Sequence, residues 1–308
     1  MNLEPLRYIY LRRVVGTALA AMGFEAAEGL ACRVARAVFN LNTPAHRAAE
    51  ARLAAATRPP ADHAPSDVPL TMASMYEHIA RFWIEALFAR RLLRDSTWRR
   101  CVHVGNEPEL RALAEARRGC LLATAYFGNP AVGVWTLGRI FRPVHVIVDT
   151  FTQPYLRAWQ RELYADRWIR PIERTDAVRA LPQLLAAGGA VVMVCEHERR
   201  RGHAVPATFL GRDLNCYPTI DRLCHWFEVP VAVVTCRRGH AAGPHRPRAM
   251  VHRHRPFSFE LALHETIAPE AVTGGDGDIT RRVMSALERV IMKHPEQYLW
   301  SSPVSPIR

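Results

Sequence analysis

Short apolar runs alternate with helical segments over most of this chain, and this alternation limits the folds open to it. Four runs free of Asp, Glu, Lys and Arg lie at residues 119–125, 144–148, 190–195 and 230–236. Strands that are apolar on both sides need cover on both sides, which is typical of a parallel sheet between two layers of helices. We therefore predict an α/β fold with a central, mostly parallel sheet flanked by helices.

Helical segments fill the stretches between these strands. Apolar residues recur at spacings of three and four from Ile79 to Leu87, which indicates a helix with one buried face. Pro130 suits the first turn of a helix that follows Asn129. Helices are predicted at residues 3–57, 72–93, 107–117, 129–140, 154–164, 175–187, 218–227 and 279–293. Residues 251–254 are expected to continue the sheet.

Residues 57–70 separate two parts of the chain. This stretch, TRPPADHAPSDVPL, holds four prolines and shows no periodicity, so it reads as a linker. The predicted organisation is an N-terminal helical, membrane-interfacial segment at residues 1–56, the linker at 57–70, and an α/β domain at 71–308.

The N-terminal segment permits two interpretations. Residues 6–38 place arginines and aromatic side chains around an apolar centre, a composition that suits the interface of a membrane. An ordinary amphipathic helix pair packed on the main domain explains the same pattern. The apolar stretch Val14–Phe24 is only 11 residues long, shorter than the ~18 that a spanning helix needs. We expect neither a cleavable signal nor a membrane span.

The chain is strongly basic, with 41 Lys and Arg against 29 Asp and Glu, a net charge of +12. Such a charge favours acidic partners: anionic lipid headgroups, an acidic carrier protein or nucleic acid. The positive residues are spread along the chain and no nucleic-acid motif accompanies them, so nucleic acid is not predicted. Seven scattered cysteines without a C-x-x-C pair indicate reduced core residues in a cytosol-facing protein, and no metal or other cofactor is predicted.

Polar clusters follow two of the predicted strands. Tyr126-Phe127-Gly128-Asn129 comes after the first apolar run, and residues 196–201, EHERRR, come after the third. In an open α/β sheet, ligands bind where the loops at the carboxyl ends of the strands converge. Both clusters are therefore predicted to share one site.

Several motifs resemble one enzyme family. The stretch GCLLATAYFGNPAVG (residues 119–133) resembles the loop of the late acyltransferases of lipid A biosynthesis, a branch of the lysophospholipid acyltransferase superfamily, in which the loop reads His-Phe-Gly-Asn-Trp-Glu. Residues 102–119, Phe209–Arg212 and HPEQYLW (residues 294–300) are similar to further family segments in the same order. The resemblance covers residues 71–302.

This resemblance implies a function. It implies a membrane-associated acyltransferase that moves a fatty acyl chain from an acyl thioester, on acyl carrier protein or coenzyme A, to a hydroxyl of a lipid or glycolipid. It also implies a location at the cytoplasmic face of the inner membrane, peripheral or N-terminally anchored. In the family, the His of the H-x4-D/E motif is the base that deprotonates the acceptor hydroxyl, and the acid holds that His.

Both members of this dyad are replaced here. Tyr126 stands where the resemblance places the His, and Ala131 stands where it places the acid. None of the 14 histidines has Asp or Glu five positions further on. A tyrosine with an unperturbed pKa of ~10 is a poor base near neutral pH. The alternative function is therefore a catalytically inactive pseudo-acyltransferase that binds lipid or regulates.

Three residues are candidates for a rebuilt catalytic site: Glu196, His197 and Tyr126. His197 is the main candidate base, and His203 is a weaker one. Neighbouring side chains of an extended segment point to opposite sides, so either Glu196 or His197 faces the site. Tyr126 has either a chemical role or a structural one in the emptied pocket.

Six further residues are predicted to bind substrate. Gly128 and Asn129 would shape the loop and cap the next helix, and Arg161 falls where the family has an arginine. Arg199 and Arg212 would bind phosphate or the carrier; for residues 199–201 a solvated charge run is the other interpretation. The predicted substrate-binding set is Gly128, Asn129, Arg161, Arg199, Gly211 and Arg212.

Overall fold

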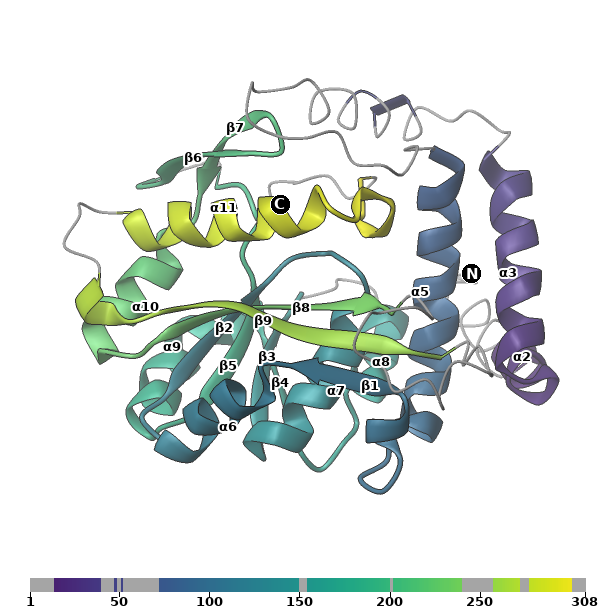
Figure 1. Cartoon of the computed structure of the whole chain (residues 1–308), viewed down its shortest axis with the longest axis horizontal. Helices are drawn as coiled ribbons and strands as arrows, with labels where there is room; N and C mark the ends of the chain where they lie inside the picture. Colours follow the sequence, from purple (N-terminus) through teal and green to yellow (C-terminus); the bar gives the residue numbers. More distant parts are fainter. Residues whose placement is uncertain are drawn as a thin grey trace.

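A mostly parallel sheet with helices on both faces forms the centre of the molecule (Figure 1). The computed structural model describes residues 14–39, 47–48, 51, 72–149, 154–199, 202–239, 257–271 and 277–300. The predicted α/β class is confirmed. The predicted linker at residues 57–70 lies outside the described residues, and the division of the chain at this point stays a prediction.

In the described part of the chain, seven strands make up the central sheet in the order β1-β9-β8-β2-β5-β3-β4. Neighbouring strands run parallel except β8 and β9, which pair antiparallel. Leu122 of β2 lies opposite Val192 on one side and Ala232 on the other. The strands are β1 (Val102–Gly105), β2 (Cys120–Thr124), β3 (Val144–Val148), β4 (Ile169–Glu173), β5 (Ala190–Val194), β8 (Val231–Arg238) and β9 (Phe259–Ile267). A separate antiparallel hairpin consists of β6 (Val205–Phe209) and β7 (Arg212–Cys216).

The four predicted apolar strands correspond to β2, β3, β5 and β8, whereas the other strands carry a weaker signal. β1 and β4 lie at the two edges of the sheet. β1 alternates buried and more exposed residues, and only the first residue of β4 is buried, so neither contains a continuous apolar run. β9 alternates buried and more exposed positions over most of its length, because Phe259, Leu261 and Leu263 enter one core and the residues between them do not. The expected strand at residues 251–254 lies outside the described residues.

Alternate side chains of the central strands enter two separate cores. Leu121 and Ala123 of β2 point into one core, and Leu122 points into the other. The first core lies under α9 (Arg174–Ala186), α10 (Thr219–Phe227) and α11 (Asp278–Ile291), and the second lies under α6 (Glu107–Ala116) and α7 (Pro130–Phe141). This two-sided burial explains why the strands read as unbroken apolar runs.

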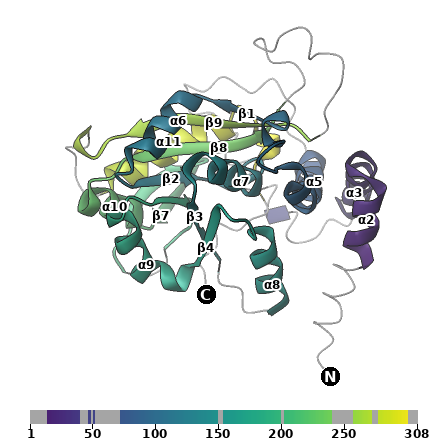
Figure 2. The ribbon, with the colours of Figure 1, turned by 90° about the horizontal axis from the view of Figure 1, so that it is seen from below.

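The N-terminal helices pack beside the sheet. α2 (Gly16–Met22) and α3 (Phe24–Phe39) lie within the stretch 3–57 that is predicted to be helical, and Gly23 separates them. α3 runs antiparallel to α5 (Met72–Leu92), and both views show the two helices side by side (Figures 1 and 2). Ring contacts join Phe24 to Phe88 at one end of the pair and Phe39 to Tyr76 at the other.

α3 has a buried face and an exposed apolar face. Ala27, Cys32 and Ala35 are buried, whereas Leu30, Val34 and Val38 are exposed. No helix in the described part of the chain has the length and apolar character needed to cross a membrane. The buried face agrees with a packed helix pair, and the exposed apolar face leaves the interfacial interpretation as a prediction.

Candidate functional site

The loop after β2 is held by the C-terminal segment of the described chain. Phe127 and Tyr298 form an isolated β-bridge. The Gly128 amide donates to the Gln297 carbonyl at 2.8 Å, and the Leu299 amide donates to the Tyr126 carbonyl at 3.0 Å. Two segments that are far apart in the sequence, 126–129 and 294–300, therefore form one structural unit.

Gly128 and Asn129 fix the shape of this loop. Gly128 has φ +62°, and a Cβ atom there would lie 2.0 Å from the carbonyl oxygen of Cys236, so no other residue fits. The Asn129 side chain accepts from the Val132 amide at 3.2 Å, which caps α7, and it donates to Glu85 at 2.8 Å. Both residues act on the loop itself; their predicted role in binding substrate stays a prediction.

Glu196 lies beneath the loop. Its Oε1 accepts from the Tyr126 amide at 2.5 Å, and its Oε2 accepts from the Tyr298 hydroxyl at 2.6 Å. Burial raises the pKa of Glu196 to about 7, although the hydrogen bonds from Tyr298 and Tyr126 lower it. Both carboxylate oxygens accept hydrogen bonds from the loop or from the segment that holds it, so this side chain stabilises the loop.

A cavity of about 450 Å³ opens beside the loop, at the carboxyl ends of β3 and β5 and between α9 and α10. Most of its wall is apolar, which suits a hydrocarbon chain. The apolar lining includes Ile147, Ala177, Leu181, Met193, Ile220, Leu223, Trp226 and Val283. This position agrees with the predicted site at the strand ends.

Three polar side chains from three strand ends meet in this cavity: Tyr126 after β2, Asp149 after β3 and His197 after β5. The Tyr126 hydroxyl donates to Asp149 Oδ2 at 3.2 Å. The Tyr126 ring meets the His197 ring edge-on, with 5.8 Å between centroids. Of the alternating pair, His197 is therefore the residue that faces the cavity.

Asp149 was not predicted as a site residue. The sequence carries a signal for it, because this carboxylate directly follows the apolar run at residues 144–148, as Tyr126 and Glu196 follow theirs. Ala131, by contrast, is buried in the first turn of α7 and offers no polar group. Asp149 is thus an acid at this site that follows β3, a strand outside the motifs that resemble the family.

The pKa values separate the roles of these groups. Burial, with the charges of Asp149 and Glu196, raises the pKa of Tyr126 far above its ordinary value, so Tyr126 stays protonated and is a donor rather than a base. Burial lowers the pKa of His197, and the Asp149 carboxylate opposes this effect. A neutral imidazole near pH 7 can accept a proton.

The mouth of the cavity is cationic. Arg174 donates to the Tyr217 hydroxyl at 3.3 Å, and the guanidinium groups of Arg174 and Arg199 lie 5.5 and 5.3 Å from the centre of the Tyr217 ring. Arg222 also lines the cavity, and Nη1 of Arg174 is buried without a hydrogen-bond partner among the described residues. An apolar wall beside a cluster of arginines matches a ligand with a hydrocarbon chain and an anionic group.

A family model described as bacterial lipid A biosynthesis acyltransferase matches residues 2–303. The chain belongs to this family. The match extends beyond residues 71–302, where the motifs resemble the family, and includes most of the N-terminal segment. Membership supports acyl transfer as the class of activity. None of the curated proteins compared with the chain matches it significantly.

Several predicted residues of this lipid A acyltransferase family member do not line the cavity. Arg161 is exposed on α8 (Pro154–Leu163), Gly211 and Arg212 lie at the turn between β6 and β7, and His203 is exposed before β6. Arg200 and Arg201 lie outside the described residues. Of the predicted arginines that the structure describes, only Arg199 lines the cavity. Arg174 and Arg222 also line it but were not predicted, because each stands isolated within or at the start of a helix.

No metal site accompanies this geometry. Among the described residues, no group of three His, Cys, Asp or Glu side chains is placed to hold a metal ion. The described cysteines are unbonded, and burial raises the pKa of Cys195, the one that lines the cavity, to about 12. This thiol is therefore protonated and is a poor nucleophile.

Proposed function

We propose that the protein transfers a fatty acyl chain from an acyl thioester, on acyl carrier protein or coenzyme A, to a hydroxyl of a lipid or glycolipid, with a rebuilt catalytic site. The single observation that carries the proposal is the convergence of His197, Tyr126 and Asp149 on an apolar cavity. We further propose that it works at the cytoplasmic face of the inner membrane, where such thioesters are available.

In this reaction His197 is the base. Its neutral imidazole takes the proton of the acceptor hydroxyl while the hydroxyl oxygen attacks the thioester carbonyl. The tetrahedral oxyanion then collapses, the C–S bond breaks, and the thiolate leaves with the proton from the imidazolium. The products are an ester and a free thiol. Asp149 holds the Tyr126 hydroxyl and stabilises the imidazolium through its negative charge.

We propose a place in the cavity for each part of the donor. The acyl chain would lie along the apolar wall, between α9 and α10. Arg174, Arg199 and Arg222 at the mouth would meet the phosphate that both carrier-bound pantetheine and coenzyme A possess. The net charge of +12 would also favour an acidic carrier protein.

A specific observation also favours the second candidate, a pseudo-acyltransferase. Both positions of the family dyad are occupied by residues without base or acid chemistry, Tyr126 and Ala131. A protein of this kind would retain the cavity and bind a lipid or regulate without turnover. The two candidates differ in one measurable quantity, the release of free thiol.

The test measures thiol release from acyl carrier protein and acyl-coenzyme A donors, with and without membrane lipid as the acceptor. Lipid-dependent release is expected for the intact chain, and His197→Ala should abolish it. His225→Ala is the matched control, because His225 is exposed on α10 and does not line the cavity. Turnover in His197→Ala at the level of the control would remove His197 as the base. No release from any donor, in a protein that binds lipid, would establish the pseudo-acyltransferase.

A further inference from the structure

A second hollow, of about 550 Å³, lies at the opposite end of the sheet from the cavity. It is bounded by the C-terminal ends of α5 and α7 and by the residues that precede β4. The two ends of the sheet are about 17 Å apart along β3, which is five residues long. The hollow and the cavity share no lining residue, so the hollow is a separate site. Its lining residues include Arg90, Arg94, Asp95, Ser96, Arg139 and Arg167.

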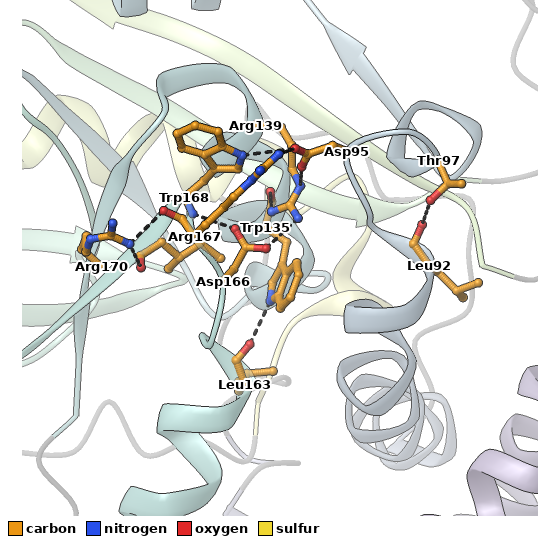
Figure 3. Close-up of polar contacts among 11 residues, drawn as sticks. Leu92, Asp95, Thr97, Trp135, Arg139, Leu163, Asp166, Arg167, Trp168 and Arg170 are labelled. Carbon is orange, nitrogen blue, oxygen red and sulfur yellow. Dashed lines mark hydrogen bonds and ion pairs between the residues drawn. The ribbon is translucent and has the colours of Figure 1, made fainter.

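Hydrogen bonds and ion pairs connect several residues that line the hollow. Arg139 is buried, donates to Asp166 at 2.7 Å and lies over the Trp135 ring at 4.9 Å (Figure 3). Asp166 also accepts from the Trp168 amide at 2.8 Å. Asp95 pairs with Arg167 and lies 3.5 Å from Arg139 Nε. The two acids of the hollow, Asp95 and Asp166, are therefore already paired with the buried Arg139 and the exposed Arg167.

The rim of the hollow carries uncompensated positive charge. Arg90 and Arg94 are exposed, and among the described residues neither has an acidic partner. Four arginines against two aspartates leave a net charge of +2 within one hollow. Arginine forks arranged around a concave surface are suited to the oxygens of a phosphate group.

An apolar surface adjoins this rim. Trp83, Leu87 and Arg90 follow one another at spacings of four and three, so they lie on one face of α5, and Arg94, just after the end of the helix, lines the hollow together with Arg90. Trp83 is 47% exposed and Leu87 is 38% exposed, and the Trp83 ring lies 4.7 Å from the ring of Trp159 on α8. This face therefore changes from apolar and aromatic to cationic along the helix.

The N-terminal helix α2 lies near the same end of α5. Arg91 of α5 donates to the carbonyl of Ala20 in α2 at 3.4 Å, which places α2 at the end of α5 that borders the hollow. Val14 and Met22, beside and within α2, are 52% and 47% exposed. Aromatic and aliphatic side chains beside arginines form the pattern of a surface that lies in a membrane interface.

We propose that the hollow between α5, α7 and β4 binds the phosphate headgroup of an anionic phospholipid in a bilayer, while Trp83 and Leu87 contact its acyl chains. The occupant follows from charge complementarity with Arg90 and Arg94 and from the apolar face that continues directly from them. This site is independent of the proposed acyl transfer, because it lies at the other end of the sheet. It orients the protein on the membrane through its folded domain.

The test is sedimentation of the full chain with phosphatidylcholine vesicles that contain or lack phosphatidylglycerol. The paired variant Arg90→Gln/Arg94→Gln should lower the partition coefficient on phosphatidylglycerol vesicles about thirtyfold, at about 1 kcal/mol per arginine near an anionic surface. Arg118→Gln/Arg179→Gln is the matched control, because it also replaces two exposed arginines, and neither of them lines the hollow. It should change the coefficient by less than about threefold if the hollow is the site.

Different results would overturn different parts of the proposal. Equal losses in the two paired variants would mean that general positive charge binds the vesicles, and would overturn the site. Equal binding to vesicles with and without phosphatidylglycerol would overturn the proposal that the hollow binds an anionic headgroup. Thermal unfolding of both variants checks that the fold is intact. As a second readout, acyl chains labelled with bromine should quench tryptophan fluorescence in the intact chain and less in Trp83→Phe; unchanged quenching would remove α5 from the contact.

Discussion

The hydroxyl of Tyr298 lies 2.6 Å from Oε2 of Glu196, and this contact joins the end of the described chain to the end of β5. The other oxygen of Glu196 accepts from the Tyr126 amide. One buried carboxyl group thereby connects the loop after β2, the end of β5 and the C-terminal segment. The position of Tyr126 in the cavity depends on all three.

The raised pKa of Glu196 predicts a pH-dependent contribution to stability. Below its ordinary pKa the carboxyl is neutral in both the folded and the unfolded states. As the pH rises from about 4.5 to about 7, the unfolded chain loses this proton and the folded chain retains it, so the free energy of unfolding falls. Relative to Glu196→Gln, which cannot ionise, the wild-type protein should lose about 3 kcal/mol over this range.

Urea unfolding of both proteins at a series of pH values between 5 and 8 measures this effect. The difference between the two curves cancels the contributions of other titrating groups. Wild type and Glu196→Gln should diverge progressively up to about pH 7 and then run parallel. Curves that stay parallel over the whole range would mean that Glu196 ionises normally in the folded protein.

Asp149→Asn tests the electrostatic coupling between Asp149 and His197. The negative charge of Asp149 raises the pKa of His197, whereas burial lowers it, and burial prevails. Removing the charge should therefore lower the pKa of His197 further below its ordinary value. Titration of the His197 ring by NMR, assigned by comparison with His197→Ala, measures the shift without requiring turnover. Tyr126→Phe is the control, since it removes the hydrogen bond to Asp149 and keeps the charge; an unchanged pKa in Asp149→Asn would contradict the coupling.

Gly128→Ala should prevent the loop from forming. The added Cβ would lie 2.0 Å from the Cys236 carbonyl oxygen, and the φ of +62° is strained for alanine. We expect destabilisation of at least 3 kcal/mol, measured as a lower midpoint of urea unfolding. Gly29→Ala is the matched control, because Gly29 lies in α3 with nothing within 4 Å of the added atom. That variant should be stabilised by up to about 1 kcal/mol.

The sequence predicts the central strands well because they are buried on both faces, as Leu121 and Leu122 show. It predicts the edge strands β1 and β4 poorly, since each leaves at least half of its residues partly or fully exposed. It also places His197 and Arg199 at the site, since each follows a recognisable strand. Arg174 and Arg222 escape prediction because their approach to the cavity depends on how α9 and α10 pack on the sheet. Such packing is a tertiary relationship that local periodicity does not encode.

Glu85 is expected to be essential for the stability of the loop, because two buried groups depend on it. Its carboxylate accepts from Asn129 at 2.8 Å and pairs with Arg238, and it is only 1% exposed. Glu85→Ala would leave a half-buried guanidinium and a buried amide without their acceptor, at a cost of about 3–5 kcal/mol. Urea unfolding measures this loss, with Glu115→Ala on the exposed face of α6 as the control, expected within about 0.5 kcal/mol of wild type. Similar stability of the two variants would show that water replaces the carboxylate, and would remove α5 as a support of the site.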